Sequence, residues 1–516
     1  MEEGGKMQKV MKLISNRAII IGLLILFQLG LLFAIIFRFQ EYFVYFYGTY
    51  IVVSAGVIIK IVNNRSNPAY KIAWLIPIML IPIFGTIIYL VFGRVRFKKE
   101  DKRKMSRIQE KERVANLETV QDIKIDDGNM DAIIQSNYLT KYGEGALFKN
   151  TTSEYFPLGE QAFEAMLREL EKAEKYIFME YFIVEEGKMW DALLEVMARK
   201  AKEGLDVRFI YDDFGCLTTL PHHYYRKMEN MGIKCCVFNP FIPVLSPIFN
   251  NRNHRKITVI DGKVAFTGGI NLADEYINEV ERFGHWKDNS IMVKGDAAWG
   301  FTLLFLSLWE FVYNDDDNFE DFYPDFKEEE LPQSHGYYQP YVDSPFDNET
   351  VGMNVYLNLI NKAKDSVLIT TPYLIIDNLL MEALCTAAKG GVDVRIIVPH
   401  KPDKWYVHAV TKSNYAQLIE AGVKIYEYTP GFIHSKTFVV DGLYATVGTV
   451  NLDYRSLFLH FECGVWMYKT AAVGAVLKDH LETEAVSQLI TLEEAENIKL
   501  PTRLGRAVLS VFSLLL

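Results

Sequence analysis

One short motif occurs twice in this chain, and the duplication constrains the fold more than any other feature. A histidine, a lysine, an aspartate, a glycine and an asparagine recur in the same order at one common offset of 180 residues. The first copy is His254, Lys256, Asp261, Gly268 and Asn271, and the second is His434, Lys436, Asp441, Gly448 and Asn451. Chance does not keep five positions in register, so the sequence predicts two related halves that face each other.

The pattern around each copy predicts an α/β half. A strand, a helix and a second strand precede each motif with short connections, which is typical of a mixed sheet covered by helices. The first half has them near residues 176–182, 189–202 and 209–211, and the second near 366–373, 379–388 and 396–398. We therefore expect an α/β fold with two tandem lobes, residues 129–332 and 333–500, and an active site between them.

Each motif is predicted to lie on a strand. Because side chains alternate along a strand, His254 and Lys256 are expected on one face, with Ile257 packing behind them. The Asp261-Gly262 pair is a tight-turn dipeptide, so we interpret Asp261, and Asp441 in the second copy, as residues that hold the turn. The glycines that follow are small enough to let the backbone approach a bound phosphate.

Two facing motifs supply what the cleavage of a phosphodiester requires. Such a bond is inert and anionic, so breaking it covalently needs a nucleophile, a proton donor and cations. His254 and His434 can be the nucleophile and the proton donor. The charge on the equatorial oxygens would be stabilised by four residues: Lys256, Lys436, Asn271 and Asn451. We expect no metal and no cofactor, because the carboxylates and the five cysteines show no ligand spacing, and we interpret His222-His223 and Asp315 to Asp317 as loops.

The N-terminal region is predicted to be a membrane leader. Residues 18–37 are apolar except for Gln28, which is long enough for a helix to cross a bilayer. Two further apolar runs follow, so residues 1–97 are expected to hold two or three spans near 18–38, 43–61 and 72–92. A cleaved signal peptide is an alternative for the first run, and a buried hairpin for the others. The segment with Pro77, Pro82 and Gly85 is the candidate for a re-entrant turn.

Charge separates the leader from the body. Residues 1–113 contain 18 Lys or Arg and 7 Asp or Glu, a net charge of +11, and the whole chain carries −10, which leaves −21 for the rest. An acidic body repels nucleic acid, so we expect no nucleic-acid partner. Residues 98–128 are predicted to be a charged linker with some helix. Residues 501–516 form an amphipathic segment that either docks on the body or lies in the membrane interface.

These segments resemble the paired His-x-Lys-x4-Asp motifs of the phospholipase D superfamily, over roughly residues 130–500. The run from Asn67 to Trp74, with Pro82 to Gly85 and Phe92-Gly93, is similar to the leader of bacterial cardiolipin synthases of that type. Gly448-Thr449 departs mildly from the usual Gly-Ser, and the run at 18–37 is an additional apolar segment.

The resemblance implies a multi-pass protein of the bacterial cell membrane. It also implies a reversible transfer in which two phosphatidylglycerols give cardiolipin and glycerol through a covalent phosphatidyl-histidine. It further implies that His254 is the nucleophile and His434 the acid, and that Asp288 and Glu462 orient the two imidazoles. The sequence itself is symmetric with respect to the two histidines.

Other functions remain open at this point. The same motifs would serve a nuclease, a membrane-bound phospholipase D that hydrolyses its substrate, or a phosphatidylserine synthase, and a non-catalytic scaffold is a further alternative. The sequence leaves undetermined which side of the membrane the lobes face, whether all three runs span, the acyl-chain preference and the oligomeric state.

Overall fold

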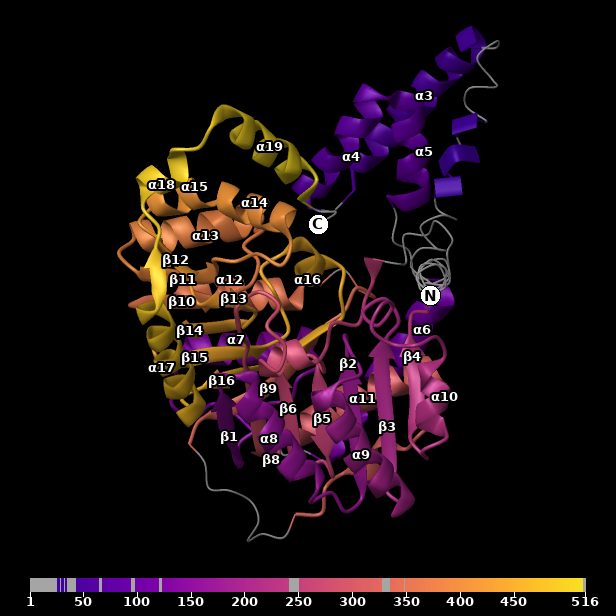
Figure 1. Ribbon diagram of the computed structural model, residues 1–516, viewed down its shortest axis with the longest axis vertical. Coiled ribbons are helices and arrows are strands. Elements are labelled where there is room, and N and C mark those ends of the chain that lie inside the picture. Colours follow the sequence, from indigo (N-terminus) through magenta and orange to yellow (C-terminus); the bar gives the residue numbers. More distant parts are fainter. Residues whose placement is uncertain are drawn as a thin grey trace, which may run out of the picture.

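The computed structural model describes residues 26–27, 29–31, 33–34, 43–64, 67–93, 98–119, 123–240, 250–326, 335–347 and 349–513. Two mixed β-sheets, one from each half of the motif repeat, form the body of the molecule (Figure 1). The predicted pair of tandem α/β lobes is therefore confirmed. The first apolar run, near residues 18–38, lies largely outside the described residues.

The sheet of lobe 1 has seven strands in the order β1-β8-β6-β5-β2-β3-β4. They are β1 (Thr151–Phe156), β2 (Tyr176–Tyr181), β3 (Asp206–Asp212), β4 (Lys234–Phe238), β5 (Ile257–Ile260), β6 (Val264–Gly268) and β8 (Ser290–Gly295). Strands β2, β3 and β4 are parallel, and the β2–β5 pair and those beyond it are antiparallel. Helices α8 (Gly159–Leu170) and α9 (Lys188–Lys202) pack their apolar faces on this sheet, and α10 (Tyr224–Glu229) packs beside β4.

The sheet of lobe 2 has eight strands in the order β17-β12-β11-β10-β14-β15-β16-β9. They are β9 (Tyr337–Asp343), β10 (Ser366–Thr370), β11 (Asp393–Pro399), β12 (Lys424–Tyr428), β14 (Thr437–Val440), β15 (Tyr444–Gly448), β16 (Glu462–Tyr468) and β17 (Ser487–Leu489). The helices of this lobe are α12 (Val351–Lys362), α13 (Asn378–Lys389), α14 (Trp405–Ser413), α15 (Tyr415–Glu420), α16 (Tyr454–Phe458) and α18 (Leu492–Glu496). The central strands β10, β11 and β12 are parallel and repeat the arrangement of β2, β3 and β4.

The two lobes share one hydrophobic core. Helix α11 (Ala297–Tyr313) is buried over its first thirteen residues, Ala297 to Trp309, as an all-round apolar helix must be. Its cluster joins Phe178 and Val259 of lobe 1 to Val447 and Val465 of lobe 2. Helix α17 (Ala471–Ala485) also packs on strands of both lobes, including β1. The lobes are thus held together by apolar packing, which fixes the geometry of whatever lies between them.

The segment predicted as a charged linker with some helix, residues 98–128, is helical from Lys99 to Thr119 and packs on the body. Helix α6 (Lys99–Thr119) lies against α11, and its Met105, Ile108 and Ala115 enter the shared core. Most of the other residues of the helix are charged or polar, so the sequence did not indicate that one face of it is buried. Helix α7 (Met130–Tyr142), which was assigned to lobe 1, packs on lobe 2 through Ala132 and Leu139.

The leader contains helices α3 (Phe43–Val62), α4 (Pro68–Leu80) and α5 (Pro82–Phe92), and its described residues among 26–34 are helical as well. The predicted span at 72–92 is therefore two helices, which separate at Ile81, before a proline that cannot continue the hydrogen-bond ladder. A side chain at Gly85 would collide with the Pro77 carbonyl, so the glycine permits the close approach of α4 and α5. Within the described residues, no helix has both the length and the apolar character required to cross a membrane.

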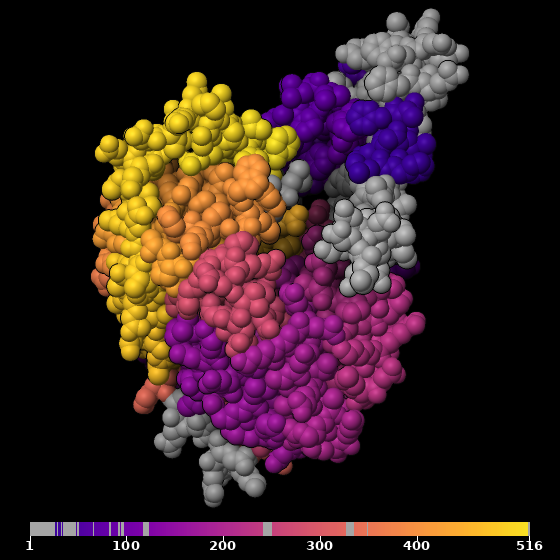
Figure 2. Space-filling model, viewed as in Figure 1, coloured from indigo at the N-terminus to yellow at the C-terminus, as the bar shows by residue number. Residues whose placement is uncertain are grey.

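The C-terminal segment folds as helix α19 (Leu500–Val511), which docks on α14 and touches α4. Figure 2 shows this helix, in yellow, beside the indigo and purple leader helices at one end of the molecule. The 3-10 helices η3 (Asp274–Ile277) and η4 (Phe319–Phe322) complete the described helical elements of the body. The predicted loops at His222-His223 and at Asp315 to Asp317 are confirmed, although Asp317 pairs with Arg208.

Candidate active site

The backbone carries each motif histidine to the opposite lobe. The short strands β7 (His285–Lys287) of lobe 1 and β13 (Gly431–Ile433) of lobe 2 pair in parallel, and Asn253 forms a parallel bridge with Phe461. The His434 N–H donates to the Lys287 carbonyl at 2.7 Å, and the His254 N–H donates to the Phe461 carbonyl at 2.9 Å. The residues after these two carbonyls are Asp288 and Glu462, so each histidine lies beside a carboxylate of the other lobe.

His254 of lobe 1 is held by Glu462 of lobe 2. Its Nδ1 lies 3.0 Å from both carboxylate oxygens of Glu462. That carboxylate also accepts hydrogen bonds from Thr449 Oγ1, at 2.5 Å, and from Ser456 Oγ. The carboxylate of Glu462 fixes the orientation of the ring and favours a proton on Nδ1. In a neutral imidazole this leaves Nε2 of His254 without a proton, as a nucleophile requires.

His434 of lobe 2 is held by Asp288 of lobe 1. Its Nδ1 lies 2.6 Å from Asp288 Oδ2, and Asp288 Oδ1 accepts the Asn289 N–H at 2.8 Å. The contact with Asp288 favours a positive charge on His434, whereas Lys436 Nζ, 2.8 Å from the same Nδ1, opposes one. The two histidines therefore differ in their immediate surroundings.

Both imidazoles are neutral in the unliganded site. Burial lowers the pKa of His254 to about 3 and that of His434 to about 4. Burial acts to raise the pKa of each carboxyl partner, but the adjacent histidine and its hydrogen bond outweigh it, so the pKa values of Asp288 and Glu462 are both lowered. The pairs are thus carboxylate and neutral imidazole, and a proton on Nδ1 is the tautomer that each carboxylate favours.

The motif lysines lie next to the histidines, with few water contacts. Lys256 is 1% exposed and Lys436 2%, and the Nζ of Lys256 donates to the His254 carbonyl at 2.6 Å. Lys436 makes the equivalent contact with the His434 carbonyl. Burial lowers the pKa of Lys256 to about 7 and that of Lys436 to about 8, since a buried ammonium loses its hydration. An anionic phosphate placed between the lobes would restore their charge.

The two asparagines differ in what they can offer a ligand. Asn271 Oδ1 accepts the Ile183 N–H at 3.0 Å, and its Nδ2 donates to Tyr276 Oη at 2.7 Å, so this amide is mainly engaged in the fold. Asn451 is 5% exposed, and its Oδ1 has no hydrogen-bond partner among the described residues. Asn451 is the better candidate for a contact with substrate, because its side-chain amide is not fully engaged in hydrogen bonds of the fold.

The motif aspartates bind backbone and not the histidines. Asp261 accepts the N–H groups of residues 174–176 at 2.8 Å each, where β2 begins. Asp441 accepts those of residues 364–366 at 2.8–2.9 Å, where β10 begins. The motif histidines and lysines themselves precede β5 and β14, which start one residue after Lys256 and Lys436.

Packing explains why a glycine occurs at the same position in both motif copies. A side chain at Gly268 would meet the Asn289 carbonyl, and one at Gly448 would meet the Cys463 carbonyl, so both glycines allow two strands to approach. This packing accounts for Gly268 and Gly448 without the approach of a bound phosphate that the sequence suggested. The next residues explain the asymmetry of the two copies: a side chain at Gly269 would collide with Asp288, whereas Thr449 donates to Glu462.

Several residues near the site escaped the sequence analysis. Arg255, between the motif histidine and lysine, pairs with the buried Glu180 at 3.0 Å and donates to the Leu304 carbonyl, which anchors the motif against α11. His460 lies 3.6 Å from Glu462, and its ring is 5.6 Å from that of His254. His254, His460 and Glu462 form a group with metal-ligand geometry, although His254 already uses Nδ1 for Glu462. In the sequence, the only sign of the role of His460 is its position two residues before Glu462.

Comparisons with known proteins show the family to which the chain belongs. The family model of the cardiolipin synthase, phospholipase D-like domain matches residues 166–290 and 356–483, and the model of the phospholipase D-nuclease N-terminal region matches residues 52–94. A cardiolipin synthase of Geobacillus kaustophilus is 33% identical over 476 residues, which cover 90% of this chain and 92% of that protein.

Two further proteins are similar. An uncharacterized protein of Streptococcus mutans is 42% identical over 463 residues, which cover 89% of this chain and all of that protein. The crystal structure of phosphatidylserine synthase from Haemophilus influenzae shares the fold, with a TM-score of 0.57 and 16% identity over 75% of this chain and all of that chain.

Proposed function

The chain belongs to the phospholipase D-type cardiolipin synthase family, and from that premise we propose that it transfers a phosphatidyl group between two phosphatidylglycerols. The products are cardiolipin and glycerol. The observation that carries the proposal is the pair of buried histidines, each held through Nδ1 by a carboxylate of the opposite lobe. Such a pair offers one nucleophilic nitrogen and one proton carrier to a single phosphate.

In the first step, Nε2 of His254 attacks the phosphorus of one phosphatidylglycerol. A phosphorus–nitrogen bond forms, the bond from phosphorus to the glycerol oxygen breaks, and that oxygen takes the proton from Nε2 of protonated His434. The anionic phosphate favours this proton on His434 when substrate is bound, since a nearby negative charge stabilises an imidazolium. Glycerol leaves, and a covalent phosphatidyl-histidine remains.

In the second step, the terminal hydroxyl of another phosphatidylglycerol attacks the same phosphorus. Its proton passes to His434, the phosphorus–nitrogen bond breaks, and cardiolipin leaves with His254 neutral again. Lys256, Lys436 and Asn451 stabilise the negative charge on the equatorial oxygens in both steps, and Asn271 holds the loop beside them. One diester bond is exchanged for another, so the reaction is reversible.

We place the enzyme at the bacterial cell membrane, with phosphatidylglycerol as donor and acceptor and no nucleic-acid partner. The match of residues 52–94 to the N-terminal family model and the apolar leader support this. We also propose that no cofactor or metal takes part, because the His254, His460 and Glu462 group needs the nucleophile as a ligand. Activity should therefore survive treatment with EDTA.

The test is to incubate the purified full chain with labelled phosphatidylglycerol in mixed micelles and resolve the lipids. Cardiolipin and glycerol should form in equal amounts, and excess glycerol should reverse the reaction. His254→Ala and His434→Ala should each remove nearly all transfer, by at least about 10³-fold, because neither step proceeds with one histidine.

Other product patterns would reject the proposal in distinct ways. Phosphatidic acid without cardiolipin would make the protein a hydrolase. Phosphatidylserine formed from a nucleotide-activated lipid and serine would make it a phosphatidylserine synthase. Near wild-type transfer in either histidine variant would exclude the two-histidine mechanism.

A further inference from the structure

Helix α19 carries an apolar stripe that faces away from the body. Leu500, Leu504 and Val508 are 68%, 59% and 59% exposed. They are spaced four residues apart and so lie along one side of a helix. The side that docks is a different one: Leu509 packs with Val407 and Val410 of α14 and with Ala73 of α4. Five residues separate Leu504 from Leu509, which is a rotation of roughly 140° at 3.6 residues per turn.

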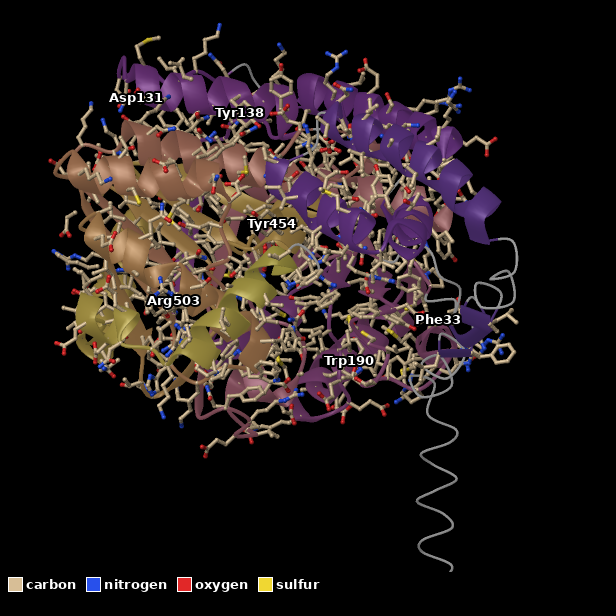
Figure 3. All side chains as sticks on the ribbon, turned by 90° about the horizontal axis from the view of Figure 1, so that it is seen from above. Phe33, Asp131, Tyr138, Trp190, Tyr454 and Arg503 are labelled. Carbon is tan, nitrogen blue, oxygen red and sulfur yellow. The ribbon has the colours of Figure 1, made fainter. Side chains whose placement is uncertain are left out.

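The two helices that α19 touches also carry exposed apolar side chains. Trp405, the first residue of α14, is 72% exposed, and α14 is the helix on which α19 docks. On α4, which α19 also touches, Met79 and Leu80 are 69% and 76% exposed. Figure 3 looks onto this end of the molecule, with Arg503 labelled on α19 and Tyr454 of α16 near it. Exposed apolar side chains therefore occur on all three of these helices, α19, α14 and α4.

The charge of the segment is opposite to that of the rest of the body. Residues 497–516 contain Lys499, Arg503 and Arg506 and neither aspartate nor glutamate, in a chain with a net charge of −10. Arg503 is exposed and lies next to the stripe. A helix with an apolar side and flanking basic residues fits the interface of an anionic bilayer, where apolar side chains enter the acyl region and cations meet phosphates. An exposed tryptophan is typical of the same depth.

This surface also lies close to the catalytic group. Asp403, two residues before Trp405, accepts a hydrogen bond from Tyr373 Oη at 2.6 Å, and Tyr373 packs in the same cluster as Ala73 and Leu509. The carboxylates of Asp403 and Asp453 are near enough to Lys436 to act on its ammonium group. A bilayer in contact with α19 would therefore meet the rim of the site in lobe 2.

We propose that the outward stripe of α19, with Trp405 and the exposed side of α4, is a docking surface for an anionic bilayer. The surface holds the lobe 2 rim of the catalytic site at the level of the lipid headgroups. The proposal shares with the proposed function only that the protein works at a membrane. It concerns a contact of the C-terminal helix, and it does not depend on which reaction the histidines perform.

The experiment uses fluorescent labelling at single exposed positions. All five native cysteines are buried, so a cysteine placed on the surface can be labelled selectively. Leu504→Cys and Val508→Cys in the full chain are labelled with an environment-sensitive dye and reconstituted into vesicles of phosphatidylethanolamine and phosphatidylglycerol. We expect a blue shift of the emission and a loss of emission when the acyl chains are brominated.

The matched control is Leu481→Cys, because Leu481 is 44% exposed and belongs to α17, a helix that lies well apart from α19 in lobe 2 (Figure 1). Its dye should neither shift nor be quenched. Absence of a shift at 504 and 508 would overturn the proposal. A blue shift without quenching would also overturn it, because the stripe would then be covered by protein, for example a second copy of the chain. None of these signals depends on catalytic activity, so the outcome is independent of the proposed reaction.

Discussion

The two motif lysines have ammonium groups that lose their protons more easily than ordinary lysines. Burial lowers the pKa of Lys256 to about 7 and that of Lys436 to about 8, while His254 and His434 are already neutral above pH 5 because their pKa values are about 3 and 4. A lysine is useful to a phosphate only while it is charged. The lysines should therefore add a loss of activity near pH 7 to 8 to the loss that begins at lower pH, where His434 gives up its proton.

We predict that kcat/KM falls as pH rises through 7 to 8. The sign follows from the lowered pKa values: below pH 7 both lysines are protonated, and above pH 8 both are neutral. The measurement is kcat/KM for dispersed phosphatidylglycerol between pH 5.5 and 9.5. A Lys256→Arg and Lys436→Arg variant should lose the additional decline between pH 7 and 8, because guanidinium stays charged, and keep the shallower decline that follows the His434 proton. An unchanged decline in that variant would assign it to another group.

At the scale of elements, the motif aspartates tie the turn after one strand to the start of the next strand in the sheet. Both aspartates adopt left-handed backbone conformations, with φ of 53° at Asp261 and 54° at Asp441, as tight turns require. Each carboxylate accepts three consecutive backbone N–H groups. Asp261 is more buried than Asp441, so water can replace its hydrogen bonds less easily.

We predict that Asp261→Ala lowers the free energy of unfolding by roughly 1–3 kcal/mol, and that Asp441→Ala lowers it by less. The folded fraction of each variant should keep its kcat, because these carboxylates contact backbone. Denaturant unfolding and the rate per folded molecule provide the two measurements. Asp261→Asn, which keeps an acceptor oxygen, is the matched control and should be intermediate in stability. Loss of kcat in a stably folded Asp261→Ala enzyme would give the aspartate a catalytic role.

At the scale of the whole molecule, neither lobe contains a complete histidine–carboxylate pair of the candidate site. His254 takes its carboxylate from lobe 2 and His434 takes its carboxylate from lobe 1. The exchange depends on the β7–β13 pair and on the bridge from Asn253 to Phe461. The shared core around α11 holds the lobes in this register.

We predict that Glu462→Gln, a change in lobe 2, slows formation of the phosphatidyl-enzyme on His254 by roughly 10²–10⁴-fold. The amide loses the charge that fixes the Nδ1 proton and the ring. Adduct formation is followed by intact-protein mass after one turnover with a short-chain phosphatidylglycerol.

Glu427→Gln is the matched control for this prediction, because Glu427 is a buried carboxylate that pairs with another histidine, His400, at 2.9 Å. It should form the adduct at the wild-type rate. Equal rates in wild type and Glu462→Gln would mean that the crossed carboxylate does not act on His254.

The sequence by itself determined the two α/β lobes, the catalytic histidines and lysines as candidates, and the carboxylates Asp288 and Glu462 through the resemblance. The duplicated spacing carries this information because a repeat fixes equivalent positions in two halves whatever their loops do. The strand and helix patterns around residues 176–211 and 366–398 are also local, since periodicity records which face of each element is buried. The sequence did not specify, however, which of the two carboxylates pairs with which histidine.

Only the tertiary structure decided that pairing, and the roles of Gly269, Thr449 and Arg255, because these depend on contacts between residues far apart in the chain. The same cause hid the apolar face of α6 beneath its charged residues, and it divided the 72–92 run at Ile81, where Gly85 lets two helices approach. Local pattern shows which side chains prefer burial. It does not show what they are buried against, and the geometry of this site follows from that packing between the lobes.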